Sequence, residues 1–211
     1  MQVAGLLSAS QLLAASFDSI EQVSHGPSHL RVTKIPTGFS DIDAMTQGLA
    51  RGSLVVLAGS TGIGKTALAL NLACNISLNG DVGVHICTLD STPTALLHRM
   101  LASMSSIESG RIATSRLTEE QWPRLGEAMA QFSSSPLFFS SPKTKHINVI
   151  RACSIEAAVL ANKPLGLLVI DSLQLLHGEP EDLLPQLREL ADELQVCLLL
   201  TCQSKPSVEL R

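Results

Sequence analysis

The stretch GSLVVLAGSTGIGKTALALNLACNISL, residues 52–78, determines the predicted fold. It begins with a short apolar run, Leu54 to Ala58, that is typical of a buried strand, and it ends in a segment with helical periodicity that begins near Lys65. A glycine-rich turn joins the two. Four residues of the stretch fit the pattern G-x-x-x-x-G-K-[ST] of a phosphate-binding P-loop: Gly59, Gly64, Lys65 and Thr66.

The residue types in this loop suit a triphosphate. Gly62 and Gly64 let backbone N–H groups approach an anion with no Cβ in the way, and the helix N-terminus behind them offers unpaired donors. Lys65 is predicted to bind the β- and γ-phosphates, and the Thr66 hydroxyl to ligate Mg²⁺. A tight strand-to-helix turn is the alternative interpretation. The predicted nucleotide-binding residues are Gly59, Ser60, Thr61, Gly62, Ile63, Gly64, Lys65, Thr66 and Ala67.

Composition restricts the class of protein. With 211 residues, 45% of them hydrophobic and 16% charged, the chain can form an α/β domain with a sizeable core. No run approaches the ~18 apolar residues of a membrane span, and the apolar N-terminus lacks the basic start of a secretory signal. The five cysteines and six histidines are scattered without metal-ligand spacing. A cytoplasmic protein with no membrane partner is therefore expected.

The charge balance argues against nucleic-acid binding over the whole surface. The net charge is −4, and the chain has no Tyr and one Trp, too few aromatic residues for a platform on which single-stranded bases stack. Any contact with DNA would have to come from a few residues or from a ring of subunits.

Strands and helices alternate along the chain, which predicts a mainly parallel sheet with helices on both faces. An apolar stripe over residues 3–24 predicts a helix that needs a partner surface, either in its own domain or in a neighbouring subunit. We therefore expect a linker helix and connection over 1–34 and a nucleotide-binding core over 35–211. Further strands are expected over 84–89, 137–139, 167–170 and 196–201, and helices within 37–49 and over 93–103, 118–132, 149–161 and 181–195.

Three polar residues follow apolar strands, at the strand ends where parallel α/β sheets bind ligands. Asp171 is predicted to hold the metal ion, since a phosphate-bound Mg²⁺ prefers one or two carboxylate ligands. Asp90 is the candidate base that orients water, with an N-cap role for the next helix as the alternative. Gln203 is the candidate sensor of the γ-phosphate, with a buried amide satisfied by local backbone as the alternative. The predicted catalytic set is Lys65, Asp90, Asp171 and Gln203.

With these motifs in place, roughly residues 12–211 resemble the C-terminal motor domain of bacterial replicative DNA helicases, the DnaB-like family with a RecA-type core. The resemblance implies a RecA-like P-loop NTPase that uses ATP and Mg²⁺, acts on single-stranded DNA in replication and assembles into a ring, expected to be a hexamer. Residues 6–25 then correspond to the linker helix that packs on the adjacent subunit. The matching segments are PTGFSDIDAMTQGL at 36–49, GKTALALN at 64–71, TLD at 88–90, RLTEEQWPRL at 116–125, LLVIDSLQLL at 167–176 and TCQSKPSVELR at 201–211.

The chain departs from the family's pattern in three places. The family has Glu where Asp90 stands, and the shorter aspartate side chain holds its carboxylate back by about 1.5 Å. The family also usually has a basic residue where Pro206 stands. The family also continues beyond Arg211, with more strands, DNA-binding loops and an arginine finger. We therefore expect that the chain alone does not unwind DNA, and that its sheet exposes an apolar edge near residues 196–201.

Two other functions stay open at this stage. One is a truncated or diverged paralogue that binds ATP as a regulatory or assembly module without helicase activity. The other, less supported by the motif order, is a P-loop small-molecule kinase.

Overall fold

The computed structural model describes residues 34–204. The chain divides into two units, residues 1–34 and 35–211, and the predicted linker helix lies outside the described residues. The elements are β1 (Lys34–Ile35), α2 (Ser40–Thr46), β2 (Leu49–Ala50), β3 (Leu54–Gly59), α3 (Lys65–Asn79), β4 (Gly83–Thr88), α4 (Pro93–Ser105), α5 (Ser109–Ala113), α6 (Gln121–Ser133), β5 (Leu137–Ser140), α7 (Ile147–Ala161), β6 (Leu165–Asp171), the 3₁₀ turn η2 (Leu173–Leu175), α8 (Pro180–Leu194) and β7 (Cys197–Gln203).

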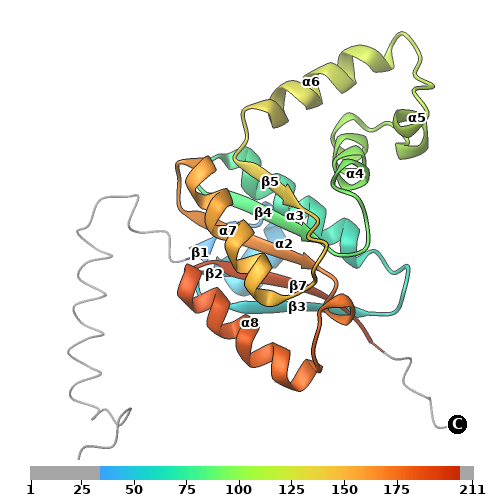
Figure 1. Ribbon diagram of the computed structural model, residues 1–211. Helices are drawn as coiled ribbons and strands as arrows, with labels where there is room; N and C mark the ends of the chain where they lie inside the picture. The colour runs from blue at the N-terminus through green and yellow to red at the C-terminus, as the bar shows by residue number, and fades with distance from the viewer. Residues whose placement is uncertain (1–33, 205–211) are drawn as a thin grey trace, which may run out of the picture. The chain divides into compact units, whose positions relative to one another are not determined.

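A five-stranded parallel sheet in the order β3-β7-β6-β4-β5 forms the centre of the second unit. Helices α7 and α8 cover one face, and α3 lies behind the other (Figure 1). The predicted α/β fold with helices on both faces is thus confirmed. The short strands β1 and β2, which pair with each other, were not expected from the sequence.

The apolar runs of the central strands explain why the sheet is buried on both faces. In β6 and β7, Leu168 and Leu198 belong to the core cluster formed with α7 and α8. Their neighbours Leu167 and Leu199 are also fully buried, and because side chains alternate along a strand, they lie on the α3 side. Continuous apolar strands are typical of parallel sheets covered on both faces.

The predicted apolar edge near residues 196–201 is wrong. Strand β7 lies between β3 and β6, with Leu57 of β3 opposite Thr201 and Ile170 of β6 opposite Leu200. The edges of the sheet are β3 and β5, and Val56 of β3 is 44% exposed. The chain's last described strand inserts between two earlier ones, so order along the sequence did not give order in the sheet.

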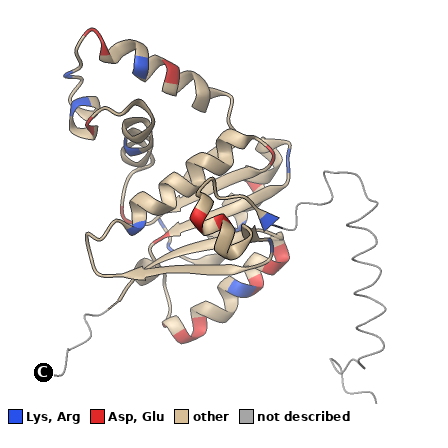
Figure 2. Cartoon of the chain, turned by 180° about the vertical axis from the view of Figure 1, so that it is seen from behind, with Lys and Arg blue, Asp and Glu red and all other residues tan. Residues whose placement is uncertain are grey.

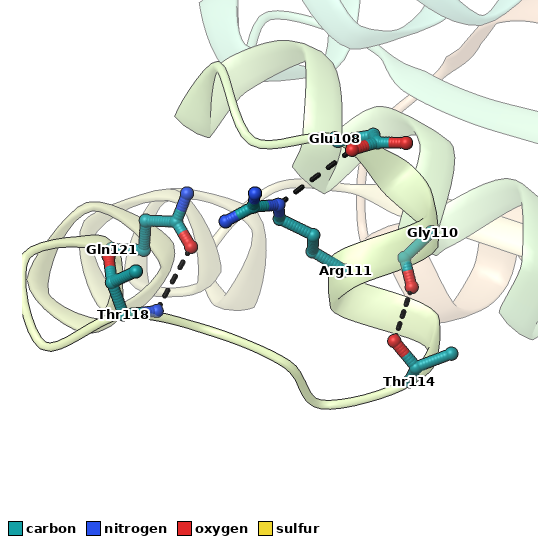
Figure 3. A network of polar contacts seen from close by, with 6 residues as sticks. All are labelled: Glu108, Gly110, Arg111, Thr114, Thr118 and Gln121. Carbon is teal, nitrogen blue, oxygen red and sulfur yellow. Dashed lines mark hydrogen bonds and ion pairs between the residues drawn. The ribbon is translucent and has the colours of Figure 1, made fainter.

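Helices α4, α5 and α6 pack around a second, smaller apolar cluster. The five-residue α5 was not predicted, because it is too short to show helical periodicity. An ion pair of 3.7 Å joins Arg111 Nε to Glu108 Oε2, and the Thr114 hydroxyl donates to the carbonyl of Gly110 at 2.7 Å (Figure 3). The buried members of the cluster are Leu101, Ile107, Ile112, Leu125 and Ala128.

Helix α6 begins at Gln121 rather than at the predicted Thr118. The side chain of Gln121 accepts a hydrogen bond of 3.1 Å from the backbone N–H of Thr118 (Figure 3), which is one half of the predicted capping pattern. This later start puts Pro123 in the first turn of α6, where a missing backbone N–H costs no helical hydrogen bond.

All five cysteines are free thiols, and three of them, Cys74, Cys87 and Cys197, are buried. Burial raises the pKa of each of these three thiols to about 11, so they stay protonated at neutral pH and pack as small apolar side chains. Among the helices within residues 34–204, none combines the length and apolarity that a bilayer span requires.

A histidine links three elements inside the core. His85 of β4 is 1% exposed. Its Nδ1 lies 2.9 Å from Ser154 Oγ of α7, and its Nε2 lies 2.8 Å from Ser140 Oγ of β5. The Ser154 hydroxyl donates to the carbonyl of Ile150, so His85 Nδ1 carries the proton and Nε2 accepts from Ser140. Desolvation lowers the pKa of His85 to about 4, which keeps the ring neutral.

This burial predicts an acid-sensitive fold. The pKa of His85 is lower in the folded chain than its ordinary 6.5, so unfolding takes up a proton as the pH falls from 6.5 toward 4. The contribution of the neutral His85 ring to the free energy of unfolding is fully present above pH 6.5. It decreases as the pH falls below 6.5, by about 3 kcal/mol in total. Urea unfolding across this range should show a steeper loss of stability in the wild type than in His85→Gln. Equal pH dependence of the two proteins would contradict the assignment.

A pair of glycine substitutions tests the packing. A Cβ on Gly166 of β6 would lie 2.5 Å from Val82 Cγ2, whereas one on Gly126 of α6 would meet nothing within 4 Å. We expect Gly166→Ala to lower the free energy of unfolding by about 1–3 kcal/mol through overpacking. Gly126→Ala is the matched control and should raise it by about 0.5–1 kcal/mol, because alanine loses less entropy in a helix. Urea unfolding of both variants measures the difference, and a neutral Gly166→Ala would contradict the packing.

Candidate functional site

The strand register brings the carboxyl ends of four strands level with one another. Gly59 at the end of β3 lies opposite Gln203 of β7, and Thr88 of β4 lies opposite Asp171 of β6. Asp171 is the one charged residue within the five described strands of this sheet, which Figure 2 shows almost entirely in tan. A charge at the end of a central strand is costly unless it is hydrogen-bonded. The hydrogen-bond partners of Asp171 therefore indicate which ligand the site suits.

The glycine-rich loop between β3 and α3 has the conformation that the motif predicts. Gly62 and Gly64 have φ values of 81° and 103°, in the left-handed region that favours glycine. A Cβ at either position would meet nothing within 4 Å, so backbone conformation and not crowding requires glycine there. Gly64 is the N-cap of α3 and provides no side-chain cap, which leaves the first N–H groups of the helix available to an anion.

The ammonium group of Lys65 lies over this loop. Its Nζ donates hydrogen bonds of 2.9 and 2.8 Å to the carbonyl oxygens of Gly59 and Ser60. An ammonium group has three donors. The remaining donor and the positive charge are therefore available to a ligand in front of the loop.

The carboxylate of Asp171 accepts two hydroxyl hydrogen bonds from different elements. Thr66 Oγ1, in the first turn of α3, donates to Asp171 Oδ2 at 2.9 Å. Thr201 Oγ1, on β7, donates to Asp171 Oδ1. Asp171 and Thr66 thus present oxygen donors side by side, a donor set that suits a hard cation such as Mg²⁺.

No group of three or more His, Cys, Asp or Glu side chains within residues 34–204 is placed to hold a metal ion. A cation at Thr66 and Asp171 would therefore need additional ligands, which phosphate oxygens and water supply in typical magnesium–nucleotide sites. The residues present fit a cation that arrives with a phosphate ligand.

These groups surround one cavity of about 350 Å³, within the usual range for small-molecule sites. All four residues of the predicted catalytic set line it, together with most of the loop. Gly59, Ser60 and Ile63, predicted to bind nucleotide, are not among the lining residues. The lining consists of Thr61, Gly62, Gly64, Lys65, Thr66, Ala67, Asp90, Ser91, Arg99, Asp171, Ser172, Thr201 and Gln203.

Asp90 and Gln203 lie at the exposed rim of the cavity. The Thr92 hydroxyl accepts from Ala95 N at 3.2 Å and is the N-cap of α4, so the capping role considered for Asp90 belongs to Thr92. Gln203 is exposed, so the alternative of a buried amide is also wrong. Neither the N-cap role considered for Asp90 nor the buried-amide role considered for Gln203 is therefore present.

Four lining residues were not identified from the sequence: Ser91, Arg99, Ser172 and Thr201. Arg99 comes from α4 and adds a second cation to the wall. Its position on the helix that follows Asp90 was a possible signal, but a single arginine on a helix carries little information. Thr201 was visible as a hydroxyl that interrupts the leucine run at the end of β7.

Residues 34–211 match the sequence model of the DnaB-like helicase C terminal domain family. The chain belongs to this family. It is 34% identical, over 98% of its length, to the replicative DNA helicase DnaB of Nostoc sp., and 33% identical, over 95% of its length, to the replicative DNA helicase DnaC of Bacillus subtilis. The chain spans 24% and 45% of the lengths of these relatives.

Solved structures agree with this assignment. A DnaB-like replicative helicase, studied with its interactions with primase, superimposes with a TM-score of 0.81 at 27% identity, over 98% of this chain and 50% of that one. A second solved structure, of an ATPase domain, gives a TM-score of 0.79 at 27% identity, over 97% of this chain and 74% of that one. The predicted DnaB-like resemblance and the RecA-like ATPase fold are both confirmed.

Proposed function

We propose that this DnaB-like chain is an ATP-binding and ATP-hydrolysing motor domain that acts in DNA unwinding during replication. The observation that carries the proposal is one cavity lined by Lys65, the hydrogen-bonded pair Thr66 and Asp171, and the strand-end residues Asp90 and Gln203. A cavity with this set of groups suits a magnesium–triphosphate ligand and a water molecule that attacks it.

In this proposal the loop and Lys65 bind the phosphates. Backbone N–H groups at Gly62, Gly64 and the start of α3 bind phosphate oxygens, and Lys65 adds a full positive charge. Thr66 and Asp171 are the residues that would hold Mg²⁺, and the bound ion would supply charge neutralisation at the phosphates. Arg99 adds a further cation to the cavity from α4.

Asp90 and Gln203 act at the rim, where the γ-phosphate of the bound nucleotide would be accessible to water. Asp90 orients the attacking water as a general base. Gln203 senses the γ-phosphate and transmits its state to the segment that follows β7. The proposal includes single-stranded DNA as the partner, a hexameric ring as the assembly and the cytoplasm as the location, and the chain's similarity to replicative DNA helicases supports it.

The second candidate function is an ATP-binding regulatory or assembly module without helicase activity. The observation that favours it is Asp90, whose carboxylate is one methylene shorter than that of glutamate. A displacement of about 1 Å at a reacting centre can cost ~10²-fold in rate. In this candidate the binding half of the site is retained and hydrolysis is lost.

Lys65→Ala tests nucleotide binding. We expect it to weaken the binding of ATP with Mg²⁺ at least tenfold, because the variant lacks the ammonium group that faces the phosphates. Lys143→Ala, which removes a lysine from a loop outside the cavity, is the matched control and should bind as the wild type does. Calorimetric titration of the full chain measures both. Undetectable binding by the wild type would exclude the proposed site.

Asp90→Glu distinguishes the motor from the module. If Asp90 is the base, lengthening its side chain should raise ATP turnover in the presence of single-stranded DNA by up to ~10²-fold, with nucleotide affinity little changed. Asp81→Glu makes the same chemical change at an exposed position outside the cavity and should leave turnover unaltered. Steady-state phosphate release, with and without DNA, is the measurement. DNA-stimulated turnover by the wild type would favour the motor, whereas tight binding without turnover by the wild type would favour the module, even where Asp90→Glu gains turnover.

A further inference from the structure

The hydrogen bond from Thr201 to Asp171 lies on the side of the carboxylate opposite Thr66. Thr66 donates to Oδ2 and Thr201 donates to Oδ1, so each oxygen of Asp171 accepts one hydroxyl. Thr201 is completely buried. Its hydroxyl therefore has no access to bulk water, and Asp171 is the acceptor that satisfies it.

The sheet fixes the relative positions of the two residues. Ile170 of β6 lies opposite Leu200 of β7, so the next residues, Asp171 and Thr201, lie side by side, and their side chains are on the same face of the sheet. Threonine is branched at Cβ, which restricts its χ1 in a strand and holds the hydroxyl in one direction. The donor to Oδ1 thus comes from a rigid position in the core.

We propose that Thr201 is a positioning residue for the magnesium ion of the nucleotide site. By binding Oδ1, it stops the Asp171 carboxylate from rotating and keeps Oδ2 directed toward Thr66 and the cavity. This inference rests on the proposed function and adds to it a residue that acts on the metal through Asp171.

The positioning matters because the hydrogen bond from Thr201 is what holds Oδ1 of the Asp171 carboxylate. The residue is the last of β6 and is followed directly by Ser172, outside the strand. Its backbone carbonyl is held by Leu89 N at 2.8 Å, but the backbone bond leaves χ1 and χ2 of the carboxylate free. Substitution of groups that orient metal ligands typically weakens metal affinity by about 10- to 100-fold.

A purely structural role predicts a different result. If Thr201 only satisfies buried polar groups, its loss should lower stability and leave the magnesium requirement of nucleotide binding unchanged. If it positions Asp171, its loss should change the magnesium requirement specifically, and a residue that keeps the hydroxyl should restore it.

The test measures ADP binding by calorimetry with the full 211-residue chain over a range of Mg²⁺ concentrations and in chelator. We expect Thr201→Val to need about 10- to 100-fold more Mg²⁺ for half-maximal ADP binding, with binding in chelator unaltered. Thr201→Ser should remain close to the wild type. Ser105→Ala, which removes a different buried hydroxyl, one that donates to Leu101 O, is the control for stability and should keep the wild-type magnesium requirement.

Thr201→Ser and Thr201→Ala keep the inference falsifiable if Thr201→Val fails to fold, because Thr201→Ala lacks the hydroxyl and Thr201→Ser retains it. A magnesium requirement that is the same in the wild type, Thr201→Val and Thr201→Ala would overturn the positioning role, whatever the change in stability. Failure of the wild type to bind ADP at any Mg²⁺ concentration would instead overturn the proposed function itself.

Discussion

The carboxylate of Asp171 joins β6 to α3 and to β7 through hydrogen bonds. It lies at the end of β6, the middle strand of the sheet, and accepts hydroxyl hydrogen bonds from α3 and β7. Asp171 is half-buried, and removing a charge from water is costly unless the charge is hydrogen-bonded. The parallel register, the position of β7 beside β6 and the entry of α3 behind the glycine-rich loop are all required to bring its donors together.

The surrounding backbone ties the loop to the same point. Leu89 N donates to Asp171 O at 2.8 Å, and Ser204 N donates to Gly59 O at 3.1 Å. These bonds join the ends of β4 and β6 and the ends of β3 and β7. The base of the cavity is therefore a continuation of the sheet, so a side chain at a strand end is held with the rigidity of the core below it.

The sequence was sufficient to predict features that depend on residues close together in the chain. The P-loop, its lysine and the strand-end Asp171 could be predicted because each depends on residue types within a few positions of one another. The edge of the sheet, the short α5 and the lining role of Arg99 could not, because each depends on which distant segments pack together. Thr201 shows the limit best. Its hydroxyl was visible in an apolar run, but the acceptor lies 30 residues away in sequence and is adjacent only through the pairing of β6 with β7.

The groups proposed for binding and the group proposed for hydrolysis lie on different elements around the cavity. The groups proposed for binding lie on α3, β6 and β7, and they are connected by hydrogen bonds to one another and to the loop. Asp90 lies at the exposed rim, within a turn in which Thr88 Oγ1 bonds both the N–H and the carbonyl of Ser91. Because this turn is anchored on the end of β4, the backbone cannot easily advance to compensate for a shorter carboxylate. If Asp90 has the proposed role, a change there alters the rate of hydrolysis and leaves the affinity for nucleotide intact, so one scaffold can serve either as a motor or as a binding module.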